Sequence, residues 1–369
     1  MVNKNKKRIV FILAQLVSGG AEKVTMNIMS LLDKELFDIH LIVMDKNGPS
    51  LGLIPEKITL HDLNVSKTIF SVLKLRNKIT QLDPDMIFST LIRTHIALGL
   101  SLIGLNHDKK PIIIMRSPNS PKLLLENKQL NFVKRFLLEF AYKQCDYIFA
   151  QTPEMKEEIH LHHKIAKDKI KVFLNPVNIN DIEKKLMNIS SPFENDNHIH
   201  VVASGRLTKQ KGFDFLIKSF KNVTEKNKNF KLYIIGEDNG EKINLQNLIN
   251  FYGLENNIKF LGYQDNPYRF YYYADLFVLS SRWEGLPNTI LENLYLRKPI
   301  IATKCIPFMT ELIQDGVNGI LVEVDNIEEM SEAILNYKKL HPSPSKHIHN
   351  KENLNNYFLF YLSEKECLK

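Results

Sequence analysis

Short apolar runs alternate with longer amphipathic stretches along the whole chain. Continuous apolar runs bounded by turn residues are typical of strands that are buried on both faces of a parallel sheet. The stretches between them, such as 21–32 and 69–82, repeat apolar residues at helical spacing. In the first half of the chain, the apolar runs predict strands at residues 8–14, 38–44, 85–89, 111–115 and 146–150.

The same pattern starts again after residue 198. Strands that alternate with helices form parallel sheets with helices on both faces. We therefore predict an α/β protein with two doubly wound, Rossmann-like domains. The strands of the second domain are expected at residues 198–204, 230–236, 257–262, 275–280 and 298–303.

The boundary between the domains is expected where Asn175 and Pro176 interrupt regular structure after an apolar strand. We assign residues 1–177 to an N-terminal domain and residues 178–340 to a C-terminal domain. Residues 341–369 are expected to form a linker and a C-terminal helix. A chain of 369 residues is long enough for two domains of ordinary size.

The composition narrows the class of protein. With 44% hydrophobic and 24% charged residues, the chain resembles a soluble globular protein. Its three cysteines lack the spacing of metal ligands and indicate reduced residues of a cytoplasmic protein. No apolar run approaches the roughly 18 residues of a spanning helix. The apolar run at 9–14 is too short for a signal peptide and is interpreted as the first strand.

The net charge of +8 is unevenly distributed. Residues 1–177 contain 26 Lys and Arg against 17 Asp and Glu, a net +9, and the remainder has a net −1. Such asymmetry indicates either an anionic partner of the N-terminal half or a Lys-rich composition without functional meaning. Nucleic acid is disfavoured as the partner because no recognised binding module is present.

Two glycines, Gly19 and Gly20, follow the first strand directly and open a helix. Ligands of doubly wound sheets bind beyond the carboxyl ends of the strands, so these glycines can allow close approach of a phosphate or a sugar. The stretch is not the G-x-G-x-x-G pattern, which disfavours a dinucleotide. A plain tight turn is the alternative.

A second loop, after the strand at 198–204, carries two cations. Gly205 ends the strand, Arg206 and Lys211 bracket the loop, and Gly212 leads into an amphipathic helix. Cations beside a helix N-terminus favour a diphosphate, because the helix dipole and the side-chain charges act together. A solvated basic loop is the alternative interpretation.

Two glutamates, Glu284 and Glu292, lie eight residues apart around a Gly-Leu-Pro turn after the strand at 275–280. Glu284 is expected in the loop and Glu292 in the helix that follows. Carboxylates accept hydrogen bonds from the vicinal hydroxyls of ribose and sugar rings. Amides at the start of that helix can meet phosphate oxygens, and Pro287 has no amide to offer. The amides concerned belong to Leu286, Asn288 and Thr289.

Together, these motifs resemble the retaining glycosyltransferases of family 4, which have the GT-B fold of two domains facing a central cleft. The resemblance covers about residues 8–337 and rests on Gly205-Arg206, Lys211-Gly212, Glu284-Gly285-x-Pro287 and Glu292. It implies that Glu292 holds the ribose and Glu284 the donor sugar, while Arg206 and Lys211 hold the diphosphate. It also implies that Gly262 and Tyr263 lie near the base, and that 341–369 returns to the N-terminal domain.

One position departs from the family pattern. Many members carry a histidine at the end of the strand that here covers 111–115, where this chain has Arg116 and Ser117. His95, after the preceding strand, is the alternative candidate for a catalytic group on the acceptor side. A structural role for His95 is the competing interpretation.

No metal site is expected. Asp83-Pro84-Asp85 has the D-x-D form of metal-dependent transferases but precedes a strand instead of ending one. The histidines at 160–164 have no accompanying carboxylate or second cluster with ligand spacing and are interpreted as a solvated helix end.

The resemblance implies a hexosyltransferase that needs no metal. It would move a hexose-type sugar from a nucleotide diphosphate sugar, expected to be UDP-linked, to a lipid-linked or oligosaccharide acceptor in cell-surface polysaccharide or lipopolysaccharide biosynthesis. A nucleotide-sugar hydrolase or epimerase, or a non-catalytic nucleotide-sugar-binding protein, remains the alternative.

The basic stretch at 128–143 suggests peripheral binding to the anionic inner face of the cell membrane. Ordinary packing of a helix on the sheet is the alternative. In that case the spacing predicts that Leu130, Val133, Leu137 and Phe140 share one apolar face.

Overall fold

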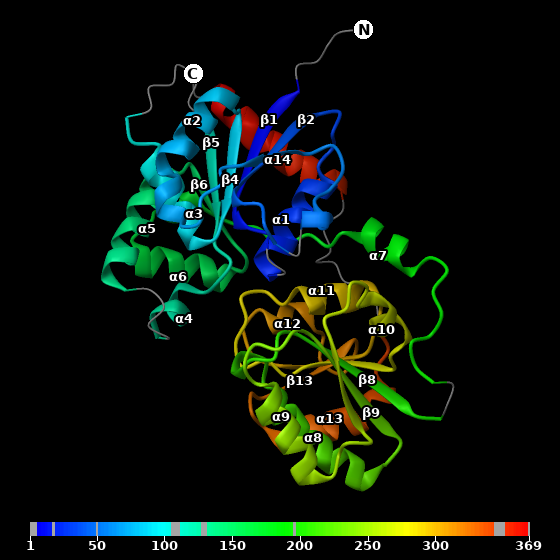
Figure 1. Cartoon of the computed structure of the whole chain (residues 1–369). Helices are drawn as coiled ribbons and strands as arrows, with labels where there is room; N and C mark the ends of the chain where they lie inside the picture. The colour runs from blue at the N-terminus through cyan, green and yellow to red at the C-terminus, as the bar shows by residue number, and fades with distance from the viewer. Residues whose placement is uncertain are drawn as a thin grey trace. The chain divides into compact units, whose positions relative to one another are not determined.

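The computed structural model describes residues 6–16, 19–48, 51–104, 111–126, 131–194, 197–342 and 351–367. The chain forms two compact units (Figure 1). Unit 1 comprises residues 1–178 together with 349–369, and unit 2 comprises residues 179–348.

Within its described residues, unit 1 is built on a seven-stranded sheet with the order β3-β2-β1-β4-β5-β6-β7. All of its strand pairs are parallel. The strands are β1 (Lys7–Gln15), β2 (Phe37–Asp45), β3 (Thr59–Asp62), β4 (Met86–Thr90), β5 (Ile112–Arg116), β6 (Tyr147–Ala150) and β7 (Ile170–Val172).

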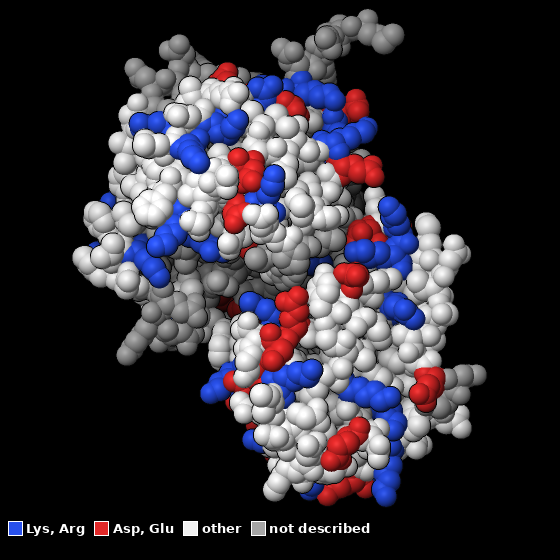
Figure 2. All heavy atoms as spheres, in the orientation of Figure 1, with Lys and Arg blue, Asp and Glu red and all other residues white. Residues whose placement is uncertain are grey.

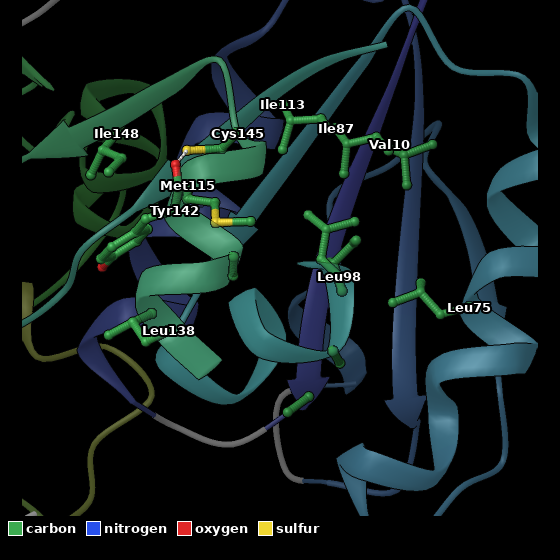
Figure 3. Packing of buried hydrophobic residues seen from close by; sticks show 14 of the residues in the cluster. Val10, Leu75, Ile87, Leu98, Ile113, Met115, Leu138, Tyr142, Cys145 and Ile148 are labelled. Atoms are coloured by element: carbon green, nitrogen blue, oxygen red, sulfur yellow. Dashed lines mark hydrogen bonds between the residues drawn. The ribbon is translucent and has the colours of Figure 1, made fainter. Parts of the chain in front are cut away.

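One face of this sheet packs against α2 (Val72–Leu82), α3 (Ile92–Ser101), α5 (Phe132–Gln144) and α6 (Pro153–His163). Figure 3 shows the contact, with Leu75, Leu98 and Leu138 of three helices directed at strand residues such as Val10 and Ile113. The short α4 (Pro121–Glu126) lies beside α6.

The opposite face packs against α1 (Gly20–Leu31) and the C-terminal helix α14 (Lys351–Cys367). Phe358 of α14 stacks on Phe11 and Phe88, with ring centroids 6.5 and 6.0 Å apart. The Asn355 side-chain oxygen accepts a hydrogen bond of 2.9 Å from the Asp33 amide. Because helices cover both faces, alternate residues of each strand enter different cores, which explains the continuous apolar runs.

In its described part, unit 2 contains a six-stranded sheet with the order β10-β9-β8-β11-β12-β13, again with parallel pairs. Its main core lies between this sheet and α8, α9 and α13. The strands are β8 (Ile199–Ser204), β9 (Phe230–Ile235), β10 (Ile258–Gly262), β11 (Leu276–Leu279), β12 (Ile300–Thr303) and β13 (Gly319–Val322). The helices are α7 (Ile179–Leu186), α8 (Phe213–Lys226), α9 (Lys242–Tyr252), α10 (Tyr268–Tyr273), α11 (Asn288–Tyr295), α12 (Met309–Leu312) and α13 (Ile327–Leu335).

Local signals set several helix starts. Asn131 caps α5 by accepting from the Lys134 amide at 2.9 Å, and Thr152 caps α6 by accepting from the Met155 amide at 3.2 Å. Pro153 then occupies the first turn of α6, where a missing amide costs nothing.

The predicted α/β class with two doubly wound sheets is confirmed, and two strands escaped the sequence analysis. β3 and β13 are edge strands of four residues each. Short edge strands carry too little apolar sequence to stand out from a loop.

Candidate active site

The loop that follows β8 brings Lys211 to the carboxyl edge of the unit-2 sheet. The 3₁₀ turn Lys209–Lys211 ends at Gly212, whose φ of +62° lies in the left-handed region. A Cβ at Gly212 would lie 2.1 Å from the Ser280 carbonyl oxygen. The turn therefore requires glycine both for its conformation and for its contact with the next loop.

The loop that follows β11 packs directly on this turn, because β11 and β8 are neighbours in the sheet. Ser280 Oγ donates to the Lys211 carbonyl oxygen at 2.8 Å, and the Arg282 amide donates to the Gln210 carbonyl oxygen at 2.7 Å. Segments that are 69 residues apart in the chain are thus held together by specific hydrogen bonds.

Glu284 occupies the centre of this arrangement. Its Oε1 accepts from Lys211 Nζ at 2.6 Å and from Ser281 Oγ at 2.6 Å. Gln210 Nε2 approaches Oε2 at 3.4 Å. Only 8% of Glu284 is exposed, so these donors compensate for the desolvation of its charge. The diphosphate candidate Lys211 and the sugar candidate Glu284 therefore form one ion pair.

Arg206 differs from Lys211 in its surroundings. It is exposed, and its guanidinium has no hydrogen bond or ion pair with any residue that the structure describes. The preceding Gly205 continues the β8–β9 ladder through a 2.8 Å bond from its amide to the Ile235 carbonyl oxygen. The predicted pair of cations thus consists of one fixed ammonium and one exposed guanidinium.

Glu292 lies within α11, which begins after Pro287 without a side-chain cap. Glu292 is 3% exposed, and Leu286 in the preceding loop is 5% exposed. Gly285, Asn288 and Thr289 are half-buried around the helix start. The predicted loop-then-helix placement of the two glutamates is what the structure has.

The base-contacting candidates lie at the end of β10, an edge strand of the same sheet. Gly262 is its last residue, with φ of +66°, and its carbonyl oxygen accepts a 2.8 Å bond from the Gly236 amide. Tyr263 follows and is 47% exposed. In the strand order β10-β9-β8-β11, the ends of β10, β8 and β11 open on the same edge. The structure therefore brings Tyr263, Arg206, Lys211 and Glu284 to one edge of unit 2.

Two residues that the sequence analysis missed support this edge. Arg282 makes two bonds of 2.9 and 2.8 Å with the Asp214 carboxylate and contacts Asp325, and these partners raise its pKa. It ties the β11 loop to α8 and to the loop before α13. Cys305 follows β12, and burial together with the Glu284 charge raises the pKa of its thiol to about 12. Neither residue has a local sequence signal, because their partners come from distant segments.

In unit 1, Gly19 is the N-cap of α1 and Gly20 is its first residue, at the carboxyl end of β1. A Cβ on Gly19 would lie 2.1 Å from Glu22 Oε2. A carboxylate against this helix start competes with a phosphate for the same amides. The sequence analysis considered a phosphate or a sugar beside these glycines. Of the two, the local chemistry favours a sugar hydroxyl.

His95 does not fit the catalytic role considered for it. It has no exposed surface, its Nε2 donates to the Arg116 carbonyl oxygen at 3.1 Å, and its Nδ1 lies 3.0 Å from Ser89 Oγ. Burial lowers the pKa of the imidazole to about 3, which keeps it neutral. Because both ring nitrogens already have partners inside unit 1, we interpret His95 as a structural residue.

Among the described residues, no cluster of three or more His, Cys, Asp or Glu side chains could hold a metal ion. Asp85 of the D-x-D sequence accepts a 2.8 Å bond from the Arg8 amide. The helix end at 160–164 is not fully solvated as expected, because His163 is buried and its Nδ1 lies 3.5 Å from Glu139. Burial lowers the pKa of His163.

Comparison with known proteins extends these observations. Residues 18–181 match the family model "Glycosyltransferase Family 4", and residues 185–354 match "Glycosyl transferases group 1". An uncharacterized glycosyltransferase of Methanocaldococcus jannaschii is 35% identical over 74% of this chain. The chain spans slightly under two thirds of that relative, 65% of its length.

A second relative is an N-acetylgalactosaminyltransferase of Campylobacter jejuni, named for an N-acetylgalactosamine-N,N'-diacetylbacillosaminyl-diphospho-undecaprenol substrate. It is 26% identical over 89% of both chains. Among solved structures, Anabaena Alr3699/HepE in complex with UDP and glucose has a TM-score of 0.75 at 18% identity, covering 97% of this chain and 100% of that one. WaaG, a glycosyltransferase involved in lipopolysaccharide biosynthesis, has a TM-score of 0.67 at 15% identity, covering 97% and 98%. These structures establish the GT-B fold, and with the two family models the chain belongs to the family 4, group 1 glycosyltransferases.

Proposed function

We propose that the protein is a retaining glycosyltransferase that moves a hexose-type sugar from a UDP-linked donor to a lipid-linked or oligosaccharide acceptor. The observation that carries the proposal is the group formed by Arg206, Lys211 and Glu284 at the carboxyl edge of the unit-2 sheet. It combines two cations suited to a diphosphate with a carboxylate suited to sugar hydroxyls.

The main chemical demand of the reaction is the negative charge that develops on the leaving diphosphate. An ammonium held by a buried partner can stabilise that charge without reorganising when it forms. The exposed guanidinium would add a second positive charge by turning towards the diphosphate. We propose that these two side chains, with the amides at the start of α11, perform this role without a metal. The described residues offer no cluster of metal ligands beside them.

The retaining outcome is proposed to arise from attack on the same face of the sugar. Oε1 of Glu284 already accepts hydrogen bonds from Lys211 and Ser281, which suits this carboxylate to orient a hydroxyl more than to attack the anomeric carbon. The leaving phosphate would then accept the proton of the acceptor.

The relatives support the kind of partners proposed. Solved structures of HepE contain UDP, UDP-glucose, or UDP with glucose. Two Campylobacter jejuni relatives are named for the transfer of N-acetylgalactosamine to undecaprenol-linked diphosphate glycans. A third relative, AmsD of Erwinia amylovora, is named for amylovoran biosynthesis. We propose a corresponding role in cell-surface polysaccharide or lipopolysaccharide biosynthesis.

We further propose that unit 1 binds the inner face of the membrane peripherally, where it would meet a lipid-linked acceptor. The α5 face differs from the expected one: Leu138, Ala141 and Tyr142 are buried, whereas Val133 is 62% exposed. Leu130 and the start of the basic stretch lie outside the described residues. The exposed start of α5 therefore presents an apolar surface that sheet packing does not use.

A second apolar group lies at the start of α2. The helices α2, α3 and α5 lie side by side, joined by a 3.1 Å bond from Arg76 to Ser101 and a 2.9 Å bond from Gln144 to Gly99. In Figure 2, most of the visible surface of unit 1 consists of uncharged residues, with several Lys and Arg groups and fewer Asp and Glu groups between them. We name it the apolar–basic surface; it consists of Lys67, Ile69, Phe70, Leu73, Lys74, Phe132, Val133, Lys134 and Phe136. None of the helices in the described part of the chain is long and apolar enough to span a bilayer.

The test is a reaction of the purified protein with a panel of UDP-sugars, with and without a glycan linked to polyprenyl diphosphate. Release of UDP that depends on the acceptor, in the presence of a chelator, and a product with the donor's anomeric configuration by NMR are the expected results. Turnover without an acceptor would favour the hydrolase or epimerase. Nucleotide-sugar binding without any turnover would favour the non-catalytic protein.

A further inference from the structure

Arg116 is the last residue of β5 and is only 1% exposed. Its guanidinium donates one hydrogen bond, from Nη2 to the side-chain oxygen of Asn175. Nε and Nη1 are buried and have no hydrogen-bond partner among the residues that the structure describes. No carboxylate of the described residues pairs with it. A buried arginine is expected to be paired, because an uncompensated charge in the interior is strongly destabilising.

The groups around Arg116 hold it in place but do not neutralise it. Asn175 Nδ2 donates to Gln151 Oε1 at 3.1 Å, and Gln151 Nε2 donates to the Ser117 carbonyl oxygen at 3.0 Å. The backbone of Arg116 is fixed from the other side by His95. This neutral chain of hydrogen bonds orients the guanidinium and leaves two of its nitrogens, Nε and Nη1, without a partner among the described residues.

These residues belong to the segments that end β5, β6 and β7, three adjacent strands of the parallel sheet. The carboxyl ends of such strands form the edge where α/β proteins bind ligands. Burial lowers the pKa of Arg116 to about 9, so the group still carries its charge at neutral pH. An oriented cation with unused N–H groups at this edge is suited to charge-assisted hydrogen bonds with phosphate oxygens.

We propose that Arg116 binds a phosphate group of a substrate in unit 1 through N–H groups of its guanidinium that make no hydrogen bond in this structure, with Asn175 as the residue that positions the guanidinium. The phosphate can come from the diphosphate of the sugar donor or from the diphosphate of a lipid-linked acceptor. The proposal rests on the proposed function, because only that function supplies these two ligands.

The experiment measures the thermal unfolding of the full chain with three probes: UDP, inorganic pyrophosphate and farnesyl diphosphate. Ligand binding to the folded state raises the unfolding temperature, and its concentration dependence gives the Kd. Arg116→Met is the main variant, and Arg93→Met, which removes an exposed arginine from α3, is the matched control.

In buffer without phosphate, Arg116→Met is expected to unfold no earlier than the wild type, because the variant no longer buries an uncompensated charge. Its Kd for pyrophosphate is expected to rise at least tenfold, whereas Arg93→Met should leave that Kd within twofold. If Arg116→Met raises the Kd of farnesyl diphosphate but not that of UDP, the phosphate belongs to the acceptor. If the Kd of UDP rises as well, the phosphate belongs to the donor.

Asn175→Asp provides a second variant that keeps the arginine. It places a carboxylate at the atom that already accepts from Nη2 and removes the hydrogen bond from Nδ2 to Gln151. Because the carboxylate neutralises the arginine, the variant should weaken the binding of pyrophosphate at least tenfold. Unchanged Kd values for all three probes in both variants, or an earlier unfolding of Arg116→Met with normal probe binding, would overturn the proposal and make Arg116 a structural residue. If instead the wild type fails to bind UDP, the proposed function is wrong; normal UDP binding with no effect at Arg116 refutes this inference alone.

Discussion

Lys211 Nζ lies 2.6 Å from Glu284 Oε1, although 73 residues separate the two in the chain. The side chains are 18% and 9% exposed, so little solvent screens the pair. A ligand that binds the ammonium also changes the surroundings of the carboxylate. The two functions assigned to them, diphosphate binding and sugar binding, are therefore physically coupled.

The two cations are expected to respond differently to alanine. Arg206→Ala and Lys211→Ala should each lower turnover by about 10²–10³, the range for losing one preorganised charge stabiliser. Arg206→Ala should leave stability unchanged because its side chain is exposed and unpaired within the described residues. Lys211→Ala should lower the free energy of unfolding by about 1–3 kcal/mol, because Glu284 loses its charged partner in a buried site.

Steady-state kinetics and denaturant unfolding of both variants measure these effects. Near-normal turnover in both variants would mean that Arg206 and Lys211 do not bind the diphosphate. Equal stability of the two would mean that the Lys211–Glu284 pair contributes nothing to the fold.

The two glutamates should separate the parts of the donor. Glu292→Gln is expected to weaken UDP and a UDP-sugar alike, by about 1–3 kcal/mol, the value of a hydrogen bond to a charged group. Glu284→Gln should weaken the binding of the UDP-sugar more than the binding of UDP. It should also weaken UDP binding slightly, because Lys211 loses its charged partner. Calorimetry with both ligands on both variants gives the comparison, and an equal loss for the two ligands in Glu284→Gln would exclude a sugar contact.

His95 should make the protein sensitive to acid. Burial holds the pKa of folded His95 at about 3, below the usual histidine value of 6.5. The unfolded chain therefore binds the proton first, and the stability contributed by neutral His95 is lost as pH falls from about 6.5 towards 3. His95→Gln should unfold more easily at pH 7 but show a weaker decrease in unfolding temperature between pH 6.5 and 4. His341→Gln, which removes an exposed histidine, is the control; identical pH slopes in His95→Gln and the wild type would contradict the assignment.

The apolar–basic surface should bind anionic vesicles in a manner that salt reverses. Each basic residue near an anionic leaflet contributes about 1 kcal/mol, and the exposed phenylalanines add apolar contact. Lys67→Glu with Lys134→Glu, and separately Phe132→Ser with Phe136→Ser, should reduce sedimentation with vesicles while UDP affinity is retained. Phe251→Ser removes a phenylalanine of α9 that is 79% exposed and serves as the control. No binding at low salt, or binding that ignores lipid charge, would favour a soluble acceptor.

The sequence by itself predicted the alternation of strands and helices, the α/β class and the loops that carry Arg206, Lys211, Glu284 and Glu292. These features are local: each depends on the periodicity of one segment or on the turn residues beside it. Short edge strands such as β3 were missed because four residues give too little periodicity. The apolar face of α5 that packs in the core was predicted wrongly. Helical spacing shows that a helix is amphipathic, but it does not show which of two overlapping apolar faces the sheet covers.

Tertiary structure decided which of these loops meet. β8 and β11 are neighbours only because the strand order places them side by side, and that adjacency alone brings Lys211 within hydrogen-bond distance of Glu284. The same packing buries His95 and leaves two nitrogens of the Arg116 guanidinium without a hydrogen-bond partner in the described part of the chain. Burial and pairing depend on residues that are distant in the chain, so a pattern read along one segment carries no information about them.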